Sequence, residues 1–347
     1  MNRGPEQRVA DVRRLIASAN AVYEDRDRIA PAIADATGLT LEGVEFGFGY
    51  LERSASDGDL RTLVDGAGNA ERVHVVLSAN VFVTPLRALA LARAAAAVVT
   101  IRPSPRDPTL TRELVERAAD NAIAIVDERD VSAIEADQVH VYGNDETIDA
   151  VRARVRPSCV VRAHGAGMGV AFVTRAADAG AAAKALAPDV VAFDQRGCLS
   201  PRIVVVEGDD AYAESVATAL SDELDAWGKQ VPRGALLPDE SAAARRWFDT
   251  LSFAGRVWRG AHDVVALAPT GAPLMLPPPG RHVHVAAFAS LQEAAAWLAP
   301  AARFVVAVGT DDPTRVARFV PPQARLSPLG RMQCPPLDGP VDRREAL

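Results

Sequence analysis

The sequence predicts an α/β protein built on doubly wound, mainly parallel sheets. From Arg72 onward, short apolar segments with the length of strands alternate with segments that have helical spacing. Such alternation is typical of parallel strands joined by crossover helices. The alternation restarts after Cys198, and 347 residues is long for one hydrophobic core. We therefore expect two domains, with a soft boundary between Asp194 and Pro201.

The elements up to Cys198 follow from apolar periodicity and from turn residues. Residues 1–70 predict a helical lead-in with helices at Val9–Val22 and Arg28–Thr37, and Glu42–Tyr50 predicts a loop. The predicted strands are Val73–Leu77, Val98–Ile101, Ala122–Val126, Gln138–Tyr142, Cys159–Ala163 and Val170–Thr174. The predicted helices are Pro85–Ala97 with Thr84 as its cap, Thr109–Ala119, a helix from the Gly143 turn to about Val155, and Ala177–Ala187.

After Cys198 the same pattern predicts three further strands and four helices. The strands are Ile203–Glu207, His282–Ala287 and Phe304–Val308. The helices are Ala211–Gly228, Ser241–Thr250, Leu291–Leu298 and Thr314–Phe319. Proline and glycine predict loops at Pro232–Pro238 and Pro269–Gly280, and an extended tail at Pro321–Leu347.

Composition excludes several classes of protein. The net charge is −7 and no basic stripe carries interleaved aromatic residues, which argues against nucleic-acid binding. Apolar stretches such as Ala94–Ile101 are too short to span a membrane, and residues 1–14 lack a signal-peptide core. Three scattered cysteines predict neither a disulfide framework nor a zinc site. We therefore expect a cytoplasmic protein.

Cys198 is the strongest candidate for a catalytic residue. It lies in a polar turn beside Arg196 and Gly197, whereas Cys159 lies in an apolar strand and reads as core. The alternative is that Cys198 is a small buried hydrophobe. Asn80 follows an apolar strand, and its amide is a candidate oxyanion donor, although Asn commonly serves turns. A thiol nucleophile with an amide donor would suit acyl chemistry at a carbonyl.

Two strand ends are weaker candidates for a cofactor site. Gly143, Asn144, Asp145 and Thr147 lie where a strand meets a helix, and a helix start offers N–H groups to phosphate. The alternative, that Asn144 or Asp145 only caps the helix, is favoured by residue type alone. Arg102-Pro103-Ser104 ends another strand, where a cation and a hydroxyl would suit a ribose or 2′-phosphate. The dinucleotide fingerprint GxGxxG is absent.

The histidines give weak signals. His164 precedes the turn Gly165-Ala166-Gly167, where it would face a cleft. His282 and His284 share one face of a strand, but no third metal ligand is in view.

Taken together, these segments resemble the aldehyde dehydrogenase superfamily, most closely its acyl-CoA reductase branch with the fatty-acid reductase of bacterial luminescence. The resemblance covers roughly Arg72 to Asp342. The matching segments are Ser78-Ala79-Asn80-Val81, Val99-Thr100-Ile101-Arg102-Pro103-Ser104 with Asp107-Pro108, Tyr142–Thr147, Phe193–Pro201, and Leu329–Gln333 with Pro335–Gly339. Arg102 replaces the family's usual lysine, and the proline after the oxyanion Asn is missing. The family's general-base Glu segment has no match; His164-Gly165-Ala166-Gly167 stands there, as expected of acylating members.

The resemblance implies two Rossmann-like doubly wound domains with the active site in the cleft between them. It assigns residues 71–194 to nicotinamide-cofactor binding, residues 195–320 to catalysis, and residues 321–347 to a tail that returns to the body. It implies that Cys198 attacks an acyl-CoA thioester, that Asn80 and the Cys198 N–H stabilise the oxyanion, and that Arg196 helps to form the thiolate. Arg102, Ser104, Gly143, Asn144, Asp145, Thr147, His164 and Gly165 become expected contacts of NADPH, with NADH still open.

The identity of the acyl donor and other functions stay open at this stage. The substrate would be a fatty acyl group on CoA or on a carrier, and a homo-oligomer is compatible with the family. The alternatives are an acyl-phosphate reductase of the same superfamily, a cofactor-free cysteine acyltransferase or thioesterase, and a non-catalytic scaffold.

Overall fold

The computed structural model describes residues 3–79, 81–127 and 131–344. It divides into two compact units, each built on its own sheet. The first unit comprises the described residues within Met1–Thr37, Gly47–Ala166 and Pro336–Glu345. The second comprises Gly38–Phe46 and Gly167–Pro335. This confirms an α/β fold with mainly parallel sheets.

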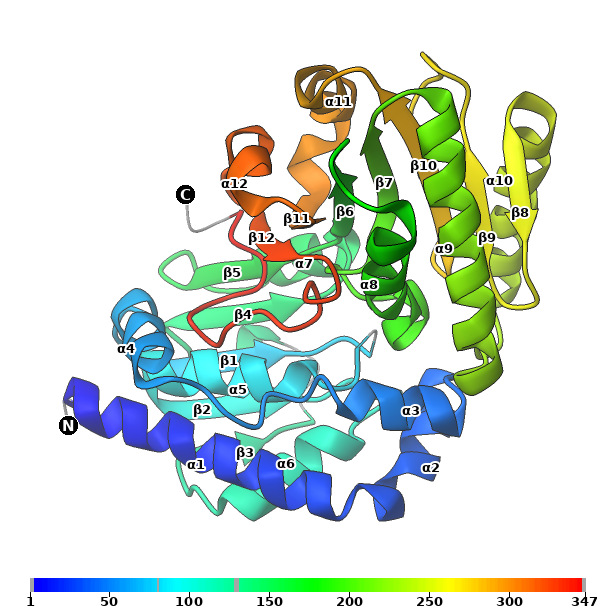
Figure 1. Ribbon diagram of the computed structural model, residues 1–347. Helices are drawn as coiled ribbons and strands as arrows, with labels where there is room; N and C mark the ends of the chain where they lie inside the picture. Colours follow the sequence, from blue (N-terminus) through cyan, green and yellow to red (C-terminus); the bar gives the residue numbers. More distant parts are fainter. Residues whose placement is uncertain (1–2, 80, 128–130, 345–347) are drawn as a thin grey trace. The chain divides into compact units, whose positions relative to one another are not determined.

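The first unit contains a five-stranded parallel sheet in the order β3-β2-β1-β4-β5 (Figure 1). The strands are β1 Ala70–Val76, β2 Ala96–Arg102, β3 Ile123–Ile125, β4 Gln138–Tyr142 and β5 Val160–His164. The helices are α1 Pro5–Glu24, α2 Arg26–Thr37, α4 Asp57–Gly66, α5 Thr84–Ala95, α6 Thr109–Ala118 and α7 Asp145–Arg152, with the 3₁₀ turn η1 Val131–Ala133. Because strand order reverses between β1 and β4, right-handed crossovers place α5 and α7 on opposite faces.

The second unit contains a seven-stranded sheet in the order β12-β11-β6-β7-β10-β9-β8, and only β8 runs antiparallel to its neighbour among the described strands. The strands are β6 Met168–Val173, β7 Pro201–Glu207, β8 Arg256–Arg259, β9 Val264–Leu267, β10 His282–Phe288, β11 Val305–Thr310 and β12 Arg325–Pro328. The helical segments are α8 Ala179–Val191, η2 Ala192–Gln195, α9 Asp210–Gln230, α10 Pro238–Ala254, α11 Leu291–Leu298, η3 Ala299–Phe304, α12 Pro313–Val316 and η4 Ala317–Phe319.

Helices pack on the strands of this sheet through separate clusters of buried side chains. Ile203 and Val205 of β7 pack with α11 in one cluster, and α10 packs over β9 through Trp247 and Leu251. Helices α8 and α9 pack against each other and contact β7. Successive side chains point to opposite faces, so both faces of the sheet are covered by helices, as in other parallel sheets.

Three of the sequence predictions were wrong. Glu42–Tyr50, predicted to be a loop, is mostly the helix α3 Leu41–Phe48, because Thr40 Oγ1 accepts a bond from the Gly43 N–H and Phe46 packs on Trp227. Thr84 does not cap α5, since it lies inside the first turn and Val83 holds the cap position without a side-chain bond. The predicted extended tail contains β12, paired with β11.

The division between the compact units also lies elsewhere than expected. It falls at Ala166 and Gly167 rather than between Asp194 and Pro201. The reason is that β6 pairs with β7 and β11, so β6 and the following α8 belong to the second sheet. Pairing across this distance leaves no signal in local periodicity.

Candidate active site

Cys198 lies in the turn that joins η2 to β7, at the edge of the second sheet where β7 begins. The thiol is partly exposed. The Ser200 N–H donates to the Gly197 carbonyl at 3.1 Å and closes the turn. A Cβ atom on Gly169 would lie 2.3 Å from the Leu199 carbonyl oxygen, and one on Gly167 would lie 3.4 Å from the Cys198 Cβ. Gly169 of the neighbouring strand β6 therefore lets the cysteine turn approach closely, whereas a Cβ on Gly167, just before β6, would only touch it.

The backbone before Cys198 is strained. Phe193, Asp194 and Gln195 have φ angles of 54°, 50° and 64°. Non-glycine residues rarely adopt this left-handed region, and each such residue costs on the order of 1–3 kcal/mol. Three in succession persist only where the surroundings fix them. Other interactions must therefore hold this turn in place.

Asp194 supplies the first of these interactions. Its Oδ1 accepts bonds from Arg281 Nε at 3.0 Å and Nη2 at 2.7 Å, and Oδ2 accepts one from the Gly234 N–H at 2.9 Å. The Asp194 carbonyl accepts a bond from the Gly280 N–H. Both charged side chains are buried, and burial lowers the pKa of Arg281 while Asp194 raises it. A buried charge pair with this many bonds fixes both partners.

Gln195 supplies the second. Its Nε2 donates to the carbonyls of Pro201 at 2.7 Å and His282 at 2.9 Å, and its Oε1 accepts the His282 N–H at 2.9 Å. The side chain thus joins the starts of β7 and β10. Asp194 and Gln195 lie in the Phe193–Pro201 segment that resembles the family's nucleophile motif, but their positioning role and that of Arg281 were not predicted.

A third support comes from the loop after β12. Asp189 of α8 accepts backbone N–H bonds from Gly330 at 2.7 Å and Met332 at 3.1 Å. Gln333 Nε2 then donates to the Ser200 hydroxyl at 3.1 Å, two residues from the cysteine. Burial raises the pKa of Asp189 to about 6, although these bonds lower it.

Two predicted members of the catalytic group have different outcomes. Arg196, expected to help form the thiolate, pairs with Glu240 at 3.2 Å, so its charge is shared with a carboxylate. Asn80 lies outside the described residues. Its role as an oxyanion donor stays a prediction.

The predicted cofactor residues lie where strands of the first sheet end. Arg102 is the last residue of β2, and Ser104 follows it; Gly143 follows β4. His164 ends β5 beside Tyr142 of β4. The structure therefore brings these residues to the carboxyl edge of one parallel sheet, which is where open α/β sheets bind ligands.

The start of α7 is already capped by its own side chains. Asn144 Oδ1 accepts bonds from the Thr147 N–H at 2.9 Å and from its hydroxyl at 2.7 Å. Asp145 and Glu146 are exposed acids in the first turn. This geometry supports the capping interpretation of Asn144, and the acids weaken the attraction of this helix start for phosphate. Contacts of Asn144, Asp145 and Thr147 with a cofactor remain predictions.

Ser104 is buried and His164 is partly buried. The His164 ring stacks on Tyr142 with centroids 4.2 Å apart, and burial lowers the pKa of His164 to about 4, with Arg162 and Arg344 acting in the same direction and Asp342 opposing it. Ser104 Oγ accepts the Arg106 N–H at 3.3 Å and is buried. Gly165 would bring a Cβ within 3.2 Å of Ile148 Cδ1, so a side chain there would crowd α7.

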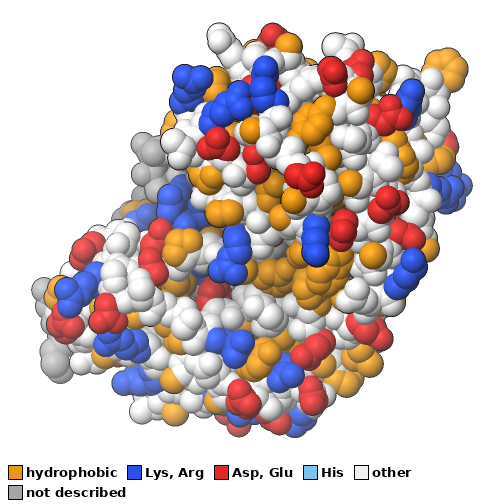
Figure 2. All heavy atoms as spheres, viewed as in Figure 1, with side chains coloured by type: hydrophobic (Ala, Val, Ile, Leu, Met, Phe, Trp, Pro, Cys, Tyr) orange, Lys and Arg blue, Asp and Glu red, His pale blue; other side chains and the backbone are white. Residues whose placement is uncertain are grey.

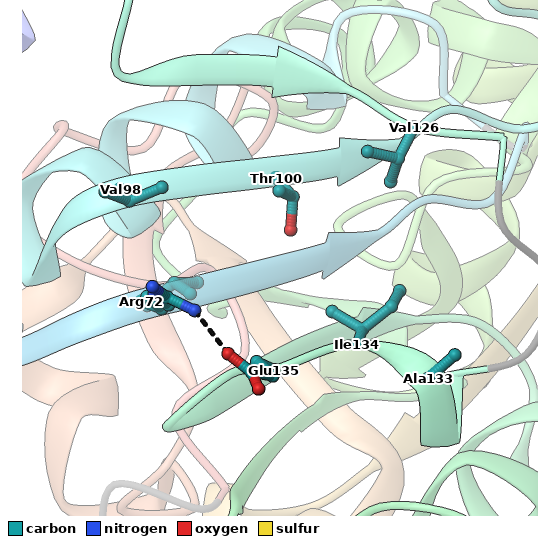
Figure 3. A pocket seen from close by; sticks show the side chains of 8 residues that line it. Arg72, Val98, Thr100, Val126, Ala133, Ile134 and Glu135 are labelled. Atoms are coloured by element: carbon teal, nitrogen blue, oxygen red, sulfur yellow. Dashed lines mark hydrogen bonds and ion pairs between the residues drawn. The ribbon is translucent and has the colours of Figure 1, made fainter.

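A separate pocket of about 370 Å³ lies on the face of the first sheet (Figure 3). Thr100 and Val98 of β2 form part of its floor, and an ion pair between Arg72 and Glu135 lies at one side. Val73, Val126, Ala133 and Ile134 complete the lining. None of the predicted cofactor residues is among these.

The charges on one face and the candidate metal ligands of the described residues bear on what the protein could bind. On the face shown in Figure 2, basic and acidic side chains are interspersed rather than gathered by sign. Among the described residues, no three His, Cys, Asp or Glu side chains form a group that could hold a metal. No described helix has the length and apolar character needed to cross a bilayer.

The fold is that of the aldehyde dehydrogenases. An oxidoreductase from Marinobacter aquaeolei is similar with a TM-score of 0.72 and 13% identity, over 99% of this chain and 84% of that chain. A putative aldehyde dehydrogenase from Burkholderia cenocepacia gives 0.70 and 17%, over 94% and 77%. The NADP-dependent glyceraldehyde-3-phosphate dehydrogenase from Bacillus halodurans C-125, complexed with NADP, gives 0.68 and 14%, over 93% and 78%.

Sequence narrows this class further. The family model described as acyl-CoA reductase (LuxC) matches residues 67–337. The chain therefore belongs to the LuxC acyl-CoA reductase family, and it is an enzyme of the acyl reductase and aldehyde dehydrogenase type, as the resemblance predicted. A search of curated proteins found no match.

Proposed function

We propose that this enzyme reduces an acyl-CoA thioester, most suitably a fatty acyl group, to an aldehyde with NADPH. The observation that carries the proposal is the strained turn, fixed by Asp194 and Gln195, which presents the partly exposed Cys198 thiol. A protein keeps such strain where function requires a fixed geometry. Membership of the acyl-CoA reductase family supports the choice of reaction.

In the proposed reaction, Cys198 Sγ attacks the thioester carbonyl and the CoA thiolate leaves, taking up a proton. The product of this step is an acyl-enzyme thioester on Cys198. The Cys198 backbone N–H and the Asn80 amide are the proposed donors to the oxyanion, and loss of one such donor typically costs on the order of 10²–10³ in rate. Reduction of the acyl-enzyme then releases the aldehyde and regenerates the thiol.

The cofactor would bind at the carboxyl edge of the first sheet. Arg102 and Ser104 are proposed to hold its adenosine ribose and phosphate, with Gly143, His164 and Gly165 beside them. The position at parallel strand ends and the side-chain-free Gly143 fit this group, although a guanidinium binds phosphate differently from the family's lysine. When bound, NADPH supplies the hydride; NADH remains the alternative.

The same proposal assigns roles to the units and to the cell compartment. The first unit would bind the cofactor and the second would carry the nucleophile. The segment His164–Gly167 contains no carboxylate to activate water, which favours reduction of the acyl-enzyme over its hydrolysis. We further propose a cytoplasmic enzyme that takes its acyl group from CoA or an acyl carrier and assembles as a homo-oligomer.

The test follows NADPH oxidation by absorbance with acyl-CoAs of short to long chain. Cys198→Ala should abolish oxidation and covalent acylation, whereas Cys159→Ala, which removes a partly buried thiol of the first unit, should keep both. Mass spectrometry of the intact protein reports the acyl adduct. Folded wild-type protein that neither oxidises NADPH nor becomes acylated would contradict the proposal and favour an acyl-phosphate reductase, a thioesterase or a scaffold.

A further inference from the structure

Arg202 stands outside the regular ladder of the second sheet. In the pairing of β6 with β7, Gly169 lies opposite Pro201 and the next residue, Val170, lies opposite Ile203. Arg202 is therefore the extra residue of a β-bulge. Bulges redirect a side chain out of the normal alternation and are frequent beside active sites. This one begins four residues after Cys198.

The Arg202 side chain lacks a partner of opposite charge at bonding distance. Its Nε is buried without a hydrogen bond, and no ion pair or hydrogen bond of its guanidinium exists among the described residues. Burial lowers the pKa of Arg202, and only the more distant Glu240 raises it. Arg202 is only partly exposed, and a buried N–H without an acceptor is costly, so an anion at this position would satisfy it.

Two further arginines surround this position. Arg196 already uses Glu240, at 3.2 Å, as its partner. Arg233 donates from Nη1 to the Gly280 carbonyl, and its Nε is buried without a hydrogen bond. Both Arg202 and Arg233 lower the pKa of His282, so both lie near the start of β10.

The local charge is positive. Glu240 pairs with Arg196 and raises the pKa of Arg202, whereas Asp194, which pairs with Arg281, and Asp263 raise the pKa of Arg233. The carboxyl group of Asp263, near Arg233, is buried without a hydrogen bond, and burial raises its pKa to about 6. The edge that presents Cys198 thus carries unsatisfied cationic donors.

We propose that Arg202, flanked by Arg196 and Arg233, binds a phosphate group of the acyl donor. Guanidinium forks bind phosphate oxygens with two parallel bonds, which fits a site made of arginine rather than lysine. The assignment rests on the proposed function, because it takes the donor to be delivered to Cys198. The phosphate is that of CoA or that of an acyl phosphate, and the arms of the experiment distinguish them.

The first arm measures binding by calorimetry on the full-length protein, with CoA and with pantetheine, which lacks phosphate. Arg202→Gln should weaken CoA binding by roughly 10- to 100-fold and leave pantetheine unchanged, because a charged hydrogen-bonding contact is lost. Arg245→Gln is the matched control, since Arg245 is exposed on α10 and the charge change is the same. Arg202→Lys keeps the charge without the fork and should give an intermediate loss.

The second arm follows acylation of Cys198 by acyl-pantetheine, acyl-CoA and acetyl phosphate. Arg202→Gln should slow acylation by the donor whose phosphate binds at this site, either acyl-CoA or acetyl phosphate. It should leave acylation by acyl-pantetheine unchanged. Slower acylation by acetyl phosphate with unchanged CoA binding assigns the site to an acyl phosphate and supports the inference. Equal behaviour of wild type and both Arg202 variants toward every phosphate-bearing ligand overturns it. If no donor acylates Cys198, the proposed function is wrong. The measurement of CoA binding still tests the role of Arg202 in that case.

Discussion

The sheet edge that carries the cysteine turn and the sheet edge that carries the predicted cofactor residues are built in different ways. At the start of β7, the cysteine turn is held by hydrogen bonds that span long stretches of sequence. One joins residues that are 87 positions apart, and another joins residues that are 133 positions apart. At the carboxyl edge of the first sheet, Asn144 bonds to a residue three positions away and Ser104 to one two positions away. Covalent chemistry needs a fixed nucleophile, whereas a bound cofactor can be positioned by short local turns. The difference indicates which edge should tolerate substitution.

The largest effect should come from breaking the buried pair at the cysteine turn. Asp194→Asn removes a charge while keeping the side chain's shape, and Arg281 is left buried without its counter-ion. We expect the free energy of unfolding to fall by about 3–5 kcal/mol, with loss of activity. Urea denaturation measures this.

The matched control is Asp225→Asn, which removes an exposed partner of Lys229 and should cost less than about 1 kcal/mol. If the two variants lost equal stability, the proposed support of the turn by Asp194 would be wrong.

A smaller effect should appear as a change in pH dependence at the same edge. Burial raises the pKa of Asp189 to about 6 from an ordinary 3.8, so between these values the folded protein binds more protons than the unfolded chain. The contribution of Asp189 to the free energy of unfolding is therefore full below about pH 4 and is lost as the pH rises through about 6. Asp189→Asn should remove on the order of 2–3 kcal/mol of this pH-dependent change.

Denaturation curves at several pH values between 4 and 7 test that expectation. Asp222→Asn, at an exposed position on α9, is the control and should follow the wild-type slope. A slope that Asp189→Asn leaves unaltered would show that the buried carboxyl titrates normally.

The smallest effect is expected at the other edge. Asn144→Ala removes the cap of α7 and should lower the free energy of unfolding by about 1 kcal/mol. Asn144→Ser keeps a capping oxygen. The affinity of this variant for NADPH should therefore stay within about twofold of wild type, a difference in binding free energy below about 0.5 kcal/mol. Fluorescence titration with NADPH measures this affinity. If the Asn144→Ser variant bound NADPH as weakly as the Asn144→Ala variant, Asn144 would instead be a contact of the cofactor.

Much of the fold could be predicted from sequence because its signals are local. Apolar periodicity located β4 at Gln138–Tyr142 and α11 at Leu291–Leu298, with the bounds that the structure shows. The short strands β8 and β9 were missed, since four residues give no periodicity. Helix α3 was missed because its aromatic contact comes from Trp227, far along the chain.

The candidate site shows the same limit. Cys198 was visible from its polar turn, but its supports were not. Arg281 reaches Asp194 across 87 positions, and the bulge at Arg202 depends on how β6 pairs with β7. Local sequence does not record either. Asn80 falls outside the described residues, so its prediction stands as made.

The first compact unit also includes the last described stretch of the chain. Arg87 of α5 is buried and donates from Nη1 to the carbonyls of Pro336 and Gly339, and Arg344 donates to the carbonyl of Ala166. The ribosome therefore delivers the closing piece of this unit only after all of the second sheet. Protein domains generally form in the order in which they emerge. Here the unit whose sheet is made first is the one that must wait to be completed.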